Sequence, residues 1–267
     1  MPTVESLEPD PDRAMAIAHD GLILLGLVGS TVHGLALGGH DDRDELGVTI
    51  EPPEHLLGTR RFDHLVWRTQ PEGAPSGAGD VDLTVYGLRR YCMLARKGSL
   101  TVLLPLFAQG DDLVHITPDG ERLREIAPWF ATRQAGRALL GYLEAQRRKI
   151  ADPAHVRDRE RVADGYDGKY AMHALRIAHQ GAEFLGTGAI TLPVAEPRRS
   201  EIMAVRRGEV DSDGALAAVD AAARRLEEAL AATRLPDHVD DGRLDAWLAT
   251  TYRDAWDRAD ASRDARR

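Results

Sequence analysis

Cysteine is almost absent from this sequence of 267 residues, and long apolar runs are missing altogether. Cys92 is the single cysteine, which excludes an internal disulfide and a CxxC zinc site. We expect Cys92 to be an ordinary buried thiol. No apolar run approaches the roughly 18 residues of a membrane-spanning helix. The opening residues, MPTVESLEPDPDR, lack the basic start and apolar stretch of an export signal, so we expect a cytoplasmic protein without a membrane partner.

Positive charge is outnumbered by negative charge, with 34 Lys and Arg against 43 Asp and Glu. The formal net charge of −9 argues against a surface that is basic all over and coats nucleic acid. The charge is unevenly spread, however: residues 133–207 contain 14 Lys and Arg against 9 Asp and Glu, whereas residues 211–267 contain 9 against 13. The middle of the chain is therefore the part suited to face an anion, and an ordinary solvated surface is the alternative.

The pattern of apolar residues changes near residue 110. Before it, short β-branched and apolar runs predict strands within 22–30, 47–52, 64–69 and 81–87, with helices over 12–20 and 88–97. After about residue 118 the apolar spacing becomes helical. We expect helices over 118–127, 133–150, 169–188, 214–233 and 242–259. The prediction is an α+β protein, with a small mixed β-sheet flanked by helices in 1–117 and an α-helical domain in 118–267.

Two features of the first part carry chemistry, and the first is a turn. Gly29 and Ser30 fall where the first strand ends, and TVHGLAL after them is able to begin a short helix. Free N–H groups at such a helix start favour a phosphate, Gly29 allows close approach of the backbone, and Ser30 offers a hydroxyl donor. A plain turn is the alternative for a Gly-Ser pair on its own.

The second feature is a crowd of acids in the stretch GGHDDRDELGV. Asp42 and Asp44 are two positions apart, so on a strand their side chains leave the same face. Two such carboxylates beside a phosphate-binding turn suit a pair of magnesium ions that bridge a triphosphate. Asp80 and Asp82 also share one face of a later strand, and Asp82 lies deeper in its apolar run. A carboxylate there is costly unless it is paired or metal-bound, so we prefer Asp82 to Asp80 as the third metal ligand. Solvated loop acids are the alternative.

These residues resemble a known family. The stretches GSTVHGLALGGHDDRDELGV and DLTVYGLRRYCMLARKGSLTVLLPLF are similar to the nucleotidyltransferase superfamily that includes DNA polymerase β, and more narrowly to its RNA-repair-pathway polymerase β family of predicted bacterial and phage nucleotidyltransferases. The resemblance covers about residues 20–210. The family pattern of a Gly-Ser turn, an Asp-x-Asp pair and a third Asp falls on Gly29, Ser30, Asp42, Asp44 and Asp82.

The resemblance implies an activity. It implies transfer of a nucleoside monophosphate from a nucleoside triphosphate, such as ATP, to a hydroxyl acceptor, with two Mg²⁺ ions as cofactors and pyrophosphate as the second product. An RNA end, in an RNA repair role, is one acceptor that it suggests. Four departures from the pattern put the acceptor surface in question. The loop before the acids is one residue longer, Asp41 replaces a common serine, and Ser99 and Pro105 stand where relatives often have Asn and Glu.

A stripe of cationic side chains lies in the later, helical part. Lys169, His173 and Arg176 follow one another at i, i+4 and i+7, which aligns them on one helix face. The part up to residue 110 has only nine Lys and Arg against fifteen acids, so we expect the stripe to supply the cations that bind the triphosphate. A solvated helix face is the alternative. In that case the cations are to be sought among Arg133, Arg137, Arg206 and Arg207.

Two functions stay open on the sequence alone: a magnesium-dependent nucleotidyltransferase, and a catalytically silent nucleotide- or RNA-binding module with the same fold. The crowded acids favour the enzyme. The aromatic residues near the predicted site are too few to indicate a channel for single-stranded nucleic acid; they are Phe62, Trp67, Tyr86 and Tyr91. The acceptor, the base of the donor and the oligomeric state are not defined by the sequence.

Overall fold

The architecture was analysed in a computed structural model, which describes residues 9–37, 43–70, 79–150, 152, 162 and 165–265. Five strands form one sheet in the order β3-β4-β2-β1-β5. Strands β2 and β4 run parallel, and the other neighbouring pairs are antiparallel, so the sheet is mixed as predicted. The strands are β1 (Leu22–Leu27), β2 (Arg43–Thr49), β3 (His64–Arg68), β4 (Val81–Gly87) and β5 (Leu113–Ile116).

The second strand shows how the sequence places its acids. The side chains of β2 are exposed or half-buried from Arg43 to Glu45 and buried from Leu46 onward. The apolar end inserts into the core, while the charged start stays at the rim of the sheet, because burial of an unpaired carboxylate is costly. Asp44 is thereby presented at the edge where β1 ends, since the backbone N–H of Val28 donates to the carbonyl oxygen of Asp44 at 2.9 Å.

Helices and turns surround the sheet. Those of the first part are α1 (Pro11–Asp20), α2 (Gly29–Val32), α3 (Pro53–Leu56), α4 (Leu88–Ala95) and α5 (Leu100–Leu103), with short 3₁₀ helices η1 (Leu104–Leu106) and η2 (Gly110–Asp112). The predicted buried thiol is confirmed: Cys92 on α4 is fully buried, and burial raises its pKa well above the ordinary value. A thiol in that environment is inert.

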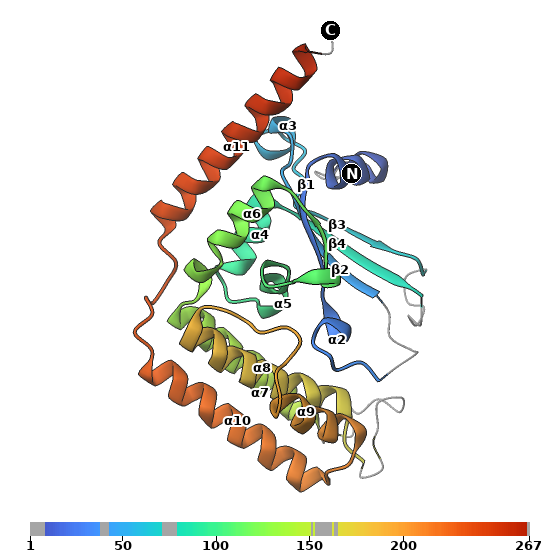
Figure 1. The fold of residues 1–267 in the computed structure, drawn as a ribbon, viewed down its shortest axis with the longest axis vertical. Coiled ribbons are helices and arrows are strands. Elements are labelled where there is room, and N and C mark those ends of the chain that lie inside the picture. Colours follow the sequence, from blue (N-terminus) through green and yellow to red (C-terminus); the bar gives the residue numbers. More distant parts are fainter. Residues whose placement is uncertain are drawn as a thin grey trace, which may run out of the picture.

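The later part of the chain is helical, as predicted. Helix α8 lies at its centre and contacts α7, α9 and α10 (Figure 1). The elements are α6 (Pro118–Glu125), η3 (Ala127–Phe130), α7 (Arg133–Ile150), α8 (Gly168–Thr187), α9 (Arg198–Arg207), α10 (Ser212–Ala232) and α11 (Asp241–Asp264). Among the described residues, no helix is both long enough and apolar enough to cross a membrane.

Strand β5 and helix α9 were not predicted. Strand β5 is four residues long and is exposed at its two central positions, so its sequence carries little alternation. Helix α9 contains four arginines in ten residues, RRSEIMAVRR, and buries only a narrow face. Both elements gain their order from the neighbours on which they pack, which local patterns do not record.

The final helix returns to the sheet. Helix α11 runs from the helical part back past α6 to α3 (Figure 1). There the hydroxyl of Tyr252 accepts a hydrogen bond from the backbone N–H of Arg89 at 2.9 Å, and Nε1 of Trp256 donates to the carbonyl of Glu51 at 3.1 Å. One hydrophobic core also includes Leu24 of the sheet and Leu175 of α8. The division at 117/118 stays a prediction.

Candidate active site

A glycine turn joins the first strand to the following short helix. Gly29 begins α2 with φ of +78°, a conformation that residues with a side chain rarely adopt. A Cβ atom on Gly29 would collide with the carboxylate of Asp44. The position therefore needs glycine for two reasons, the backbone conformation and the space beside the acid. The predicted turn and short helix are both present, and Ser30 is the second residue of α2.

Two of the predicted acids lie side by side. Asp44 on β2 and Asp82 on β4 are direct partners in the parallel pairing, so their side chains emerge on the same face. They share a cavity of about 280 Å³ with Thr84, Tyr86 and Ser99. Nε of Arg68 lies 3.4 Å from a carboxylate oxygen of Asp82. Asp42, the partner of Asp44 in the predicted Asp-x-Asp pair, lies outside the described residues, as does Asp41.

Asp80 has a different environment from Asp82. Its carboxylate accepts hydrogen bonds from the hydroxyl of Thr69 at 3.0 Å and from Nε2 of Gln70 at 2.7 Å. These contacts tie the end of β3 to the start of β4. Asp80 therefore has a bridging contact set within the sheet, whereas Asp82 faces the cavity with Asp44.

The donor set at this edge is compatible with magnesium. Asp44 and Asp82 offer the carboxylate oxygens that Mg²⁺ prefers, and Gly29 leaves space for the carboxylate of Asp44. Within the described ranges, no three His, Cys, Asp or Glu side chains form a cluster that could hold a metal. The described part of this sheet edge thus contains two of the three acids that the sequence predicted. The carboxylates of these two acids are suitable ligands for Mg²⁺.

A second cavity, of about 210 Å³, adjoins Asp44 from the helical side. Gly29, Ser30 and Asp44 line it from the sheet, and His173 and Arg176 line it from α8. Side chains about 140 residues apart in the sequence therefore meet at one space. The remaining lining residues are Val28, His33, Leu35, Thr101, Leu104, Tyr142 and Met172.

Only part of the predicted cationic stripe lines this cavity. His173 and Arg176 line it, but Lys169, one helical turn before His173, is half-buried and is not among the described lining residues. Three of the four alternative cations lie near acids, and the fourth, Arg206, contacts Met172 of this cavity. Arg133 and Arg137 lie near Asp237. The other two are Arg207, which lies near Glu209, and Arg206, which donates to Sδ of Met172 at 3.3 Å.

Arg176 is the most unusual charge in the cavity. Its residue surface is 6% exposed, and burial lowers the pKa of Arg176 to about 10, so it remains a cation at neutral pH. Nη1 donates to Nε2 of His33 at 3.0 Å and to Oε1 of Gln180 at 3.2 Å. In the described part of the chain no carboxylate pairs with it, and its Nε is buried without a hydrogen-bond partner. A buried cation without an acid is suited to receive an anion.

His33 and Tyr142 are lining residues that sequence reasoning missed. His33 directly follows α2, and burial, together with Arg176 and His173, lowers its pKa well below the ordinary value, so its imidazole is neutral. Tyr142 on α7 is 50% exposed. The only signal for His33 was its place beside the Gly-Ser turn. Tyr142 had none, because α7 reaches the cavity through tertiary packing alone.

Two of the departures from the family pattern, Ser99 and Pro105, lie among the described residues and differ in burial. Ser99 lines the cavity of Asp44 and Asp82, so it is placed to contact a ligand there. Pro105 is buried under β1, where a Cβ atom on Gly26 would lie 3.2 Å from its Cα. The change at position 105 therefore affects packing beneath the sheet, and the change at position 99 affects the site.

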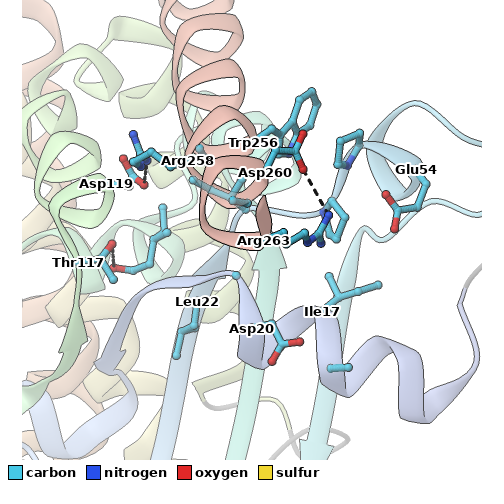
Figure 2. Close-up of a pocket in the computed structure, with 18 of the residues that line it drawn as sticks. Ile17, Asp20, Leu22, Glu54, Thr117, Asp119, Trp256, Arg258, Asp260 and Arg263 are labelled. Atoms are coloured by element: carbon cyan, nitrogen blue, oxygen red, sulfur yellow. Dashed lines mark hydrogen bonds and ion pairs between the residues drawn. The ribbon is translucent and has the colours of Figure 1, made fainter. Parts of the chain in front are cut away.

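A further cavity, of about 460 Å³, lies at the other end of β1, between α1 and α11 (Figure 2). Most of its charged groups are matched within the protein. Asp119 pairs with Arg258, Asp260 lies 3.4 Å from Nη1 of Arg263, and Glu54 lies 3.1 Å from Nη2 of Arg13. Internal pairing leaves little charge for a ligand, which distinguishes this cavity from the one at Arg176.

The geometry agrees with a comparison to known families. Residues 12–249 match the model of the RNA repair pathway DNA polymerase beta family, so the chain belongs to that family. Among curated proteins, none matches it. Among solved structures, it is similar to a nucleotidyltransferase-like protein from Exiguobacterium sibiricum, with 13% identity and a TM-score of 0.30 over 82% of this chain and 72% of that one.

Proposed function

We propose that the protein is a magnesium-dependent nucleotidyltransferase that moves a nucleoside monophosphate from a nucleoside triphosphate to a hydroxyl acceptor. The acceptor oxygen forms a bond to the α-phosphorus, the bond from that phosphorus to the bridging oxygen of the β-phosphate breaks, and pyrophosphate leaves. The hydroxyl proton passes to solvent. The observation that carries this proposal is the cavity where the Gly29-Ser30 turn, the acid Asp44 and the buried cation Arg176 converge.

Each of these residues has a role in the proposal. The backbone of Gly29 and the hydroxyl of Ser30 bind the phosphates, and Asp42, Asp44 and Asp82 bind the metal ions. Bound magnesium lowers the pKa of the acceptor hydroxyl and neutralises the triphosphate and its leaving group. Arg176 and His173 supply positive charge and donors from the opposite wall. Positioning and charge neutralisation provide most of the catalysis in such a site.

The charge balance explains why cations from α8 are needed. Two magnesium ions and three carboxylates sum to about +1, whereas a triphosphate carries roughly −4. The guanidinium of Arg176 is a suitable group, because it engages two phosphate oxygens at once. Lys169 belongs to the same proposal as a further cation, one helical turn before His173 on α8.

The acceptor approaches, in this proposal, through the cavity beside Asp82. Thr84, Tyr86 and Ser99 line it together with the two acids. An RNA end is the acceptor class that the family name suggests, and the hydroxyl of its last ribose is the attacking group. The net charge of −9 argues against a surface that coats a long duplex, which is compatible with contact at an RNA end only.

The test uses labelled triphosphates. The protein, Mg²⁺ and each of the four α-labelled ribonucleoside triphosphates are incubated with cellular RNA or with a protein extract. Pyrophosphate release and label in a macromolecule are the expected results, and Asp44→Asn should abolish both. If the wild-type protein binds triphosphate but transfers no label to either acceptor pool, the silent binding module is the better description.

A further inference from the structure

His33 connects the phosphate-binding turn to the helical part of the molecule. It directly follows α2, which begins at Gly29, and its residue surface is only 2% exposed. Its carbonyl oxygen accepts a hydrogen bond from the backbone N–H of Val194 at 3.1 Å. Its ring contacts two side chains of α8, so both its backbone and its side chain engage the helical part.

The contacts of the ring are directional. Nη1 of Arg176 donates to Nε2 of His33 at 3.0 Å, because a guanidinium has no acceptor. Nε2 of Gln180 lies 3.2 Å from Nδ1 of His33, and Oε1 of Gln180 accepts from the same Nη1 of Arg176 at 3.2 Å. Because Nε2 of His33 accepts the bond from Arg176, the proton of the neutral imidazole lies on Nδ1, and the neighbouring Nε2 of Gln180 is also a donor, so no hydrogen bond joins Gln180 to His33. Three buried side chains thus form a triangle of contacts in which both hydrogen bonds come from Nη1 of Arg176. Nη1 of Arg176 is held by two acceptors, Nε2 of His33 and Oε1 of Gln180, which limits rotation of the guanidinium.

The orientation of the guanidinium matters because its other donors face a ligand. A guanidinium is planar and its five N–H groups form a rigid fork, so fixing one Nη directs the remaining donors. Arg176 lines the cavity of Gly29 and Ser30, and its Nε has no hydrogen-bond partner among the described residues. The donors that the triangle does not use are therefore available to an anion in that cavity.

We propose that His33 is a positioning residue that, through Arg176, aims the guanidinium at the β- and γ-phosphates of a triphosphate bound on the Gly29 turn. This inference rests on the proposed function and adds the part of the substrate that Arg176 recognises. It also makes recognition of these phosphates depend on contact between the sheet and the helical part, since His33 belongs to one and Arg176 to the other. A buried histidine that only fills space is the competing explanation.

His179 offers a matched control for that explanation. It is equally buried, at 2% exposure, and it lies on α8 beside Gln180. Its Nε2 is 3.2 Å from a carboxylate oxygen of Glu201, and it lines a different cavity, of about 480 Å³. Loss of His179 should destabilise the fold without altering recognition of phosphates.

The experiment measures dissociation constants by calorimetry for magnesium with ATP, GTP, CTP or UTP, and for the matching monophosphates. We expect His33→Leu to weaken binding of the preferred triphosphate about tenfold, because an oriented hydrogen bond to a charged group is lost. Binding of the monophosphate, which lacks the β- and γ-phosphates, should stay unchanged. His33→Gln, which retains an acceptor, should restore much of the triphosphate affinity, and His179→Leu should leave both affinities unchanged.

Other outcomes overturn the inference. Equal weakening of monophosphate and triphosphate, or no weakening, shows that His33 only fills space. If Arg176→Ala weakens binding as much in His33→Leu as in the parent, the two residues act separately. Should His33→Leu fail to fold, Gln180→Leu removes the other acceptor and must show the same selective loss. A wild-type protein that binds no triphosphate overturns the proposed function itself, which is a distinct result because it is seen before any substitution.

Discussion

Two buried ionisable groups lie on opposite sides of the junction between the sheet and the helices, and they differ in how they are accommodated. Arg176 remains charged, since its pKa of about 10 is well above neutral pH, and it borders a cavity. Burial raises the pKa of Glu51 to about 7, and its carboxylate accepts from the backbone N–H of Leu88 at 3.1 Å and is hydrogen-bonded to Tyr252.

The comparison shows which buried charge points to a ligand. Glu51 can become neutral by binding a proton, and its hydrogen bonds join the start of α4 to α11, so its environment is satisfied within the protein. Arg176 cannot lose its proton at physiological pH, and its described neighbours, His33 and Gln180, are neutral. A charge that can neither be removed nor paired is balanced most easily by a bound anion.

The largest effect is expected from removing one of the proposed metal ligands beside the cavity of Arg176. Asp44→Asn should lower nucleotidyl transfer by about 10³-fold or more, since metal binding and charge neutralisation are lost together. Asp42→Asn and Asp82→Asn should behave alike. Stability should stay the same or increase, because crowding of like charges is relieved. Pyrophosphate release with Mg²⁺ and thermal unfolding measure the two effects.

Asp80 is the matched control for the acids. Asp80→Asn keeps a side chain that can accept from Thr69 and Gln70, so transfer should change by less than about threefold. Equal losses in Asp80→Asn and Asp82→Asn would mean that the third ligand was chosen wrongly. Full activity in Asp44→Asn would contradict the metal site as a whole.

Removal of the unpaired cation tests the comparison directly. Arg176→Ala should raise the KM for the triphosphate about 100-fold, because two charge-assisted hydrogen bonds to phosphate are lost. The same change relieves an uncompensated buried charge, so the free energy of unfolding should fall less than for an ordinary core truncation. Steady-state kinetics and urea unfolding check this. An unchanged KM would place the phosphate-binding cation elsewhere, with Arg206 the next candidate.

Glu51 tests the other half of the comparison, the buried group that can become neutral. Its pKa is about 7 in the folded protein and near 4.5 as a free group, so its contribution to stability is full below about pH 4.5 and is lost as the pH rises through 7. At pH 8 the ionised carboxylate should cost roughly 3 kcal/mol. Glu51→Gln should therefore increase stability relative to the parent at pH 8 and lose the advantage at pH 5. The free energy of unfolding in urea is measured for both proteins at each pH. His33, whose lowered pKa changes stability with pH in the opposite direction, is present in both proteins, so its contribution cancels in the difference. A difference that does not vary with pH would contradict the assignment.

The smallest effect is expected at the phosphate-binding turn. Ser30→Ala should raise the KM for the triphosphate up to about tenfold with a smaller change in kcat, since one hydrogen bond to the bound phosphates is lost. Gly29→Val is the sharper companion, because a side chain there strains the backbone and meets the carboxylate of Asp44. Nucleotide binding by Gly29→Val that equals that of the parent would exclude this turn as the phosphate site.

Local sequence determined a good part of this protein. The runs around 22–27 and 81–87 alternate or cluster as strands do, and the Gly-Ser pair at a strand end predicts the turn that α2 begins. Spacing by two placed Asp82 on a definite face of its strand. These features depend on residues within a few positions of one another, and steric preference and burial act at that range.

Tertiary structure decided the rest. The pairing of Asp44 with Asp82 depends on the order of the strands, and the separation of Asp80 from them depends on Thr69 and Gln70, which follow β3. The triangle of His33, Arg176 and Gln180 joins residues more than 140 positions apart. No local pattern records such a contact, because the packing of one element on another is determined by the whole core. Whether a helix face is a solvated surface or the wall of a site is therefore decided by tertiary packing.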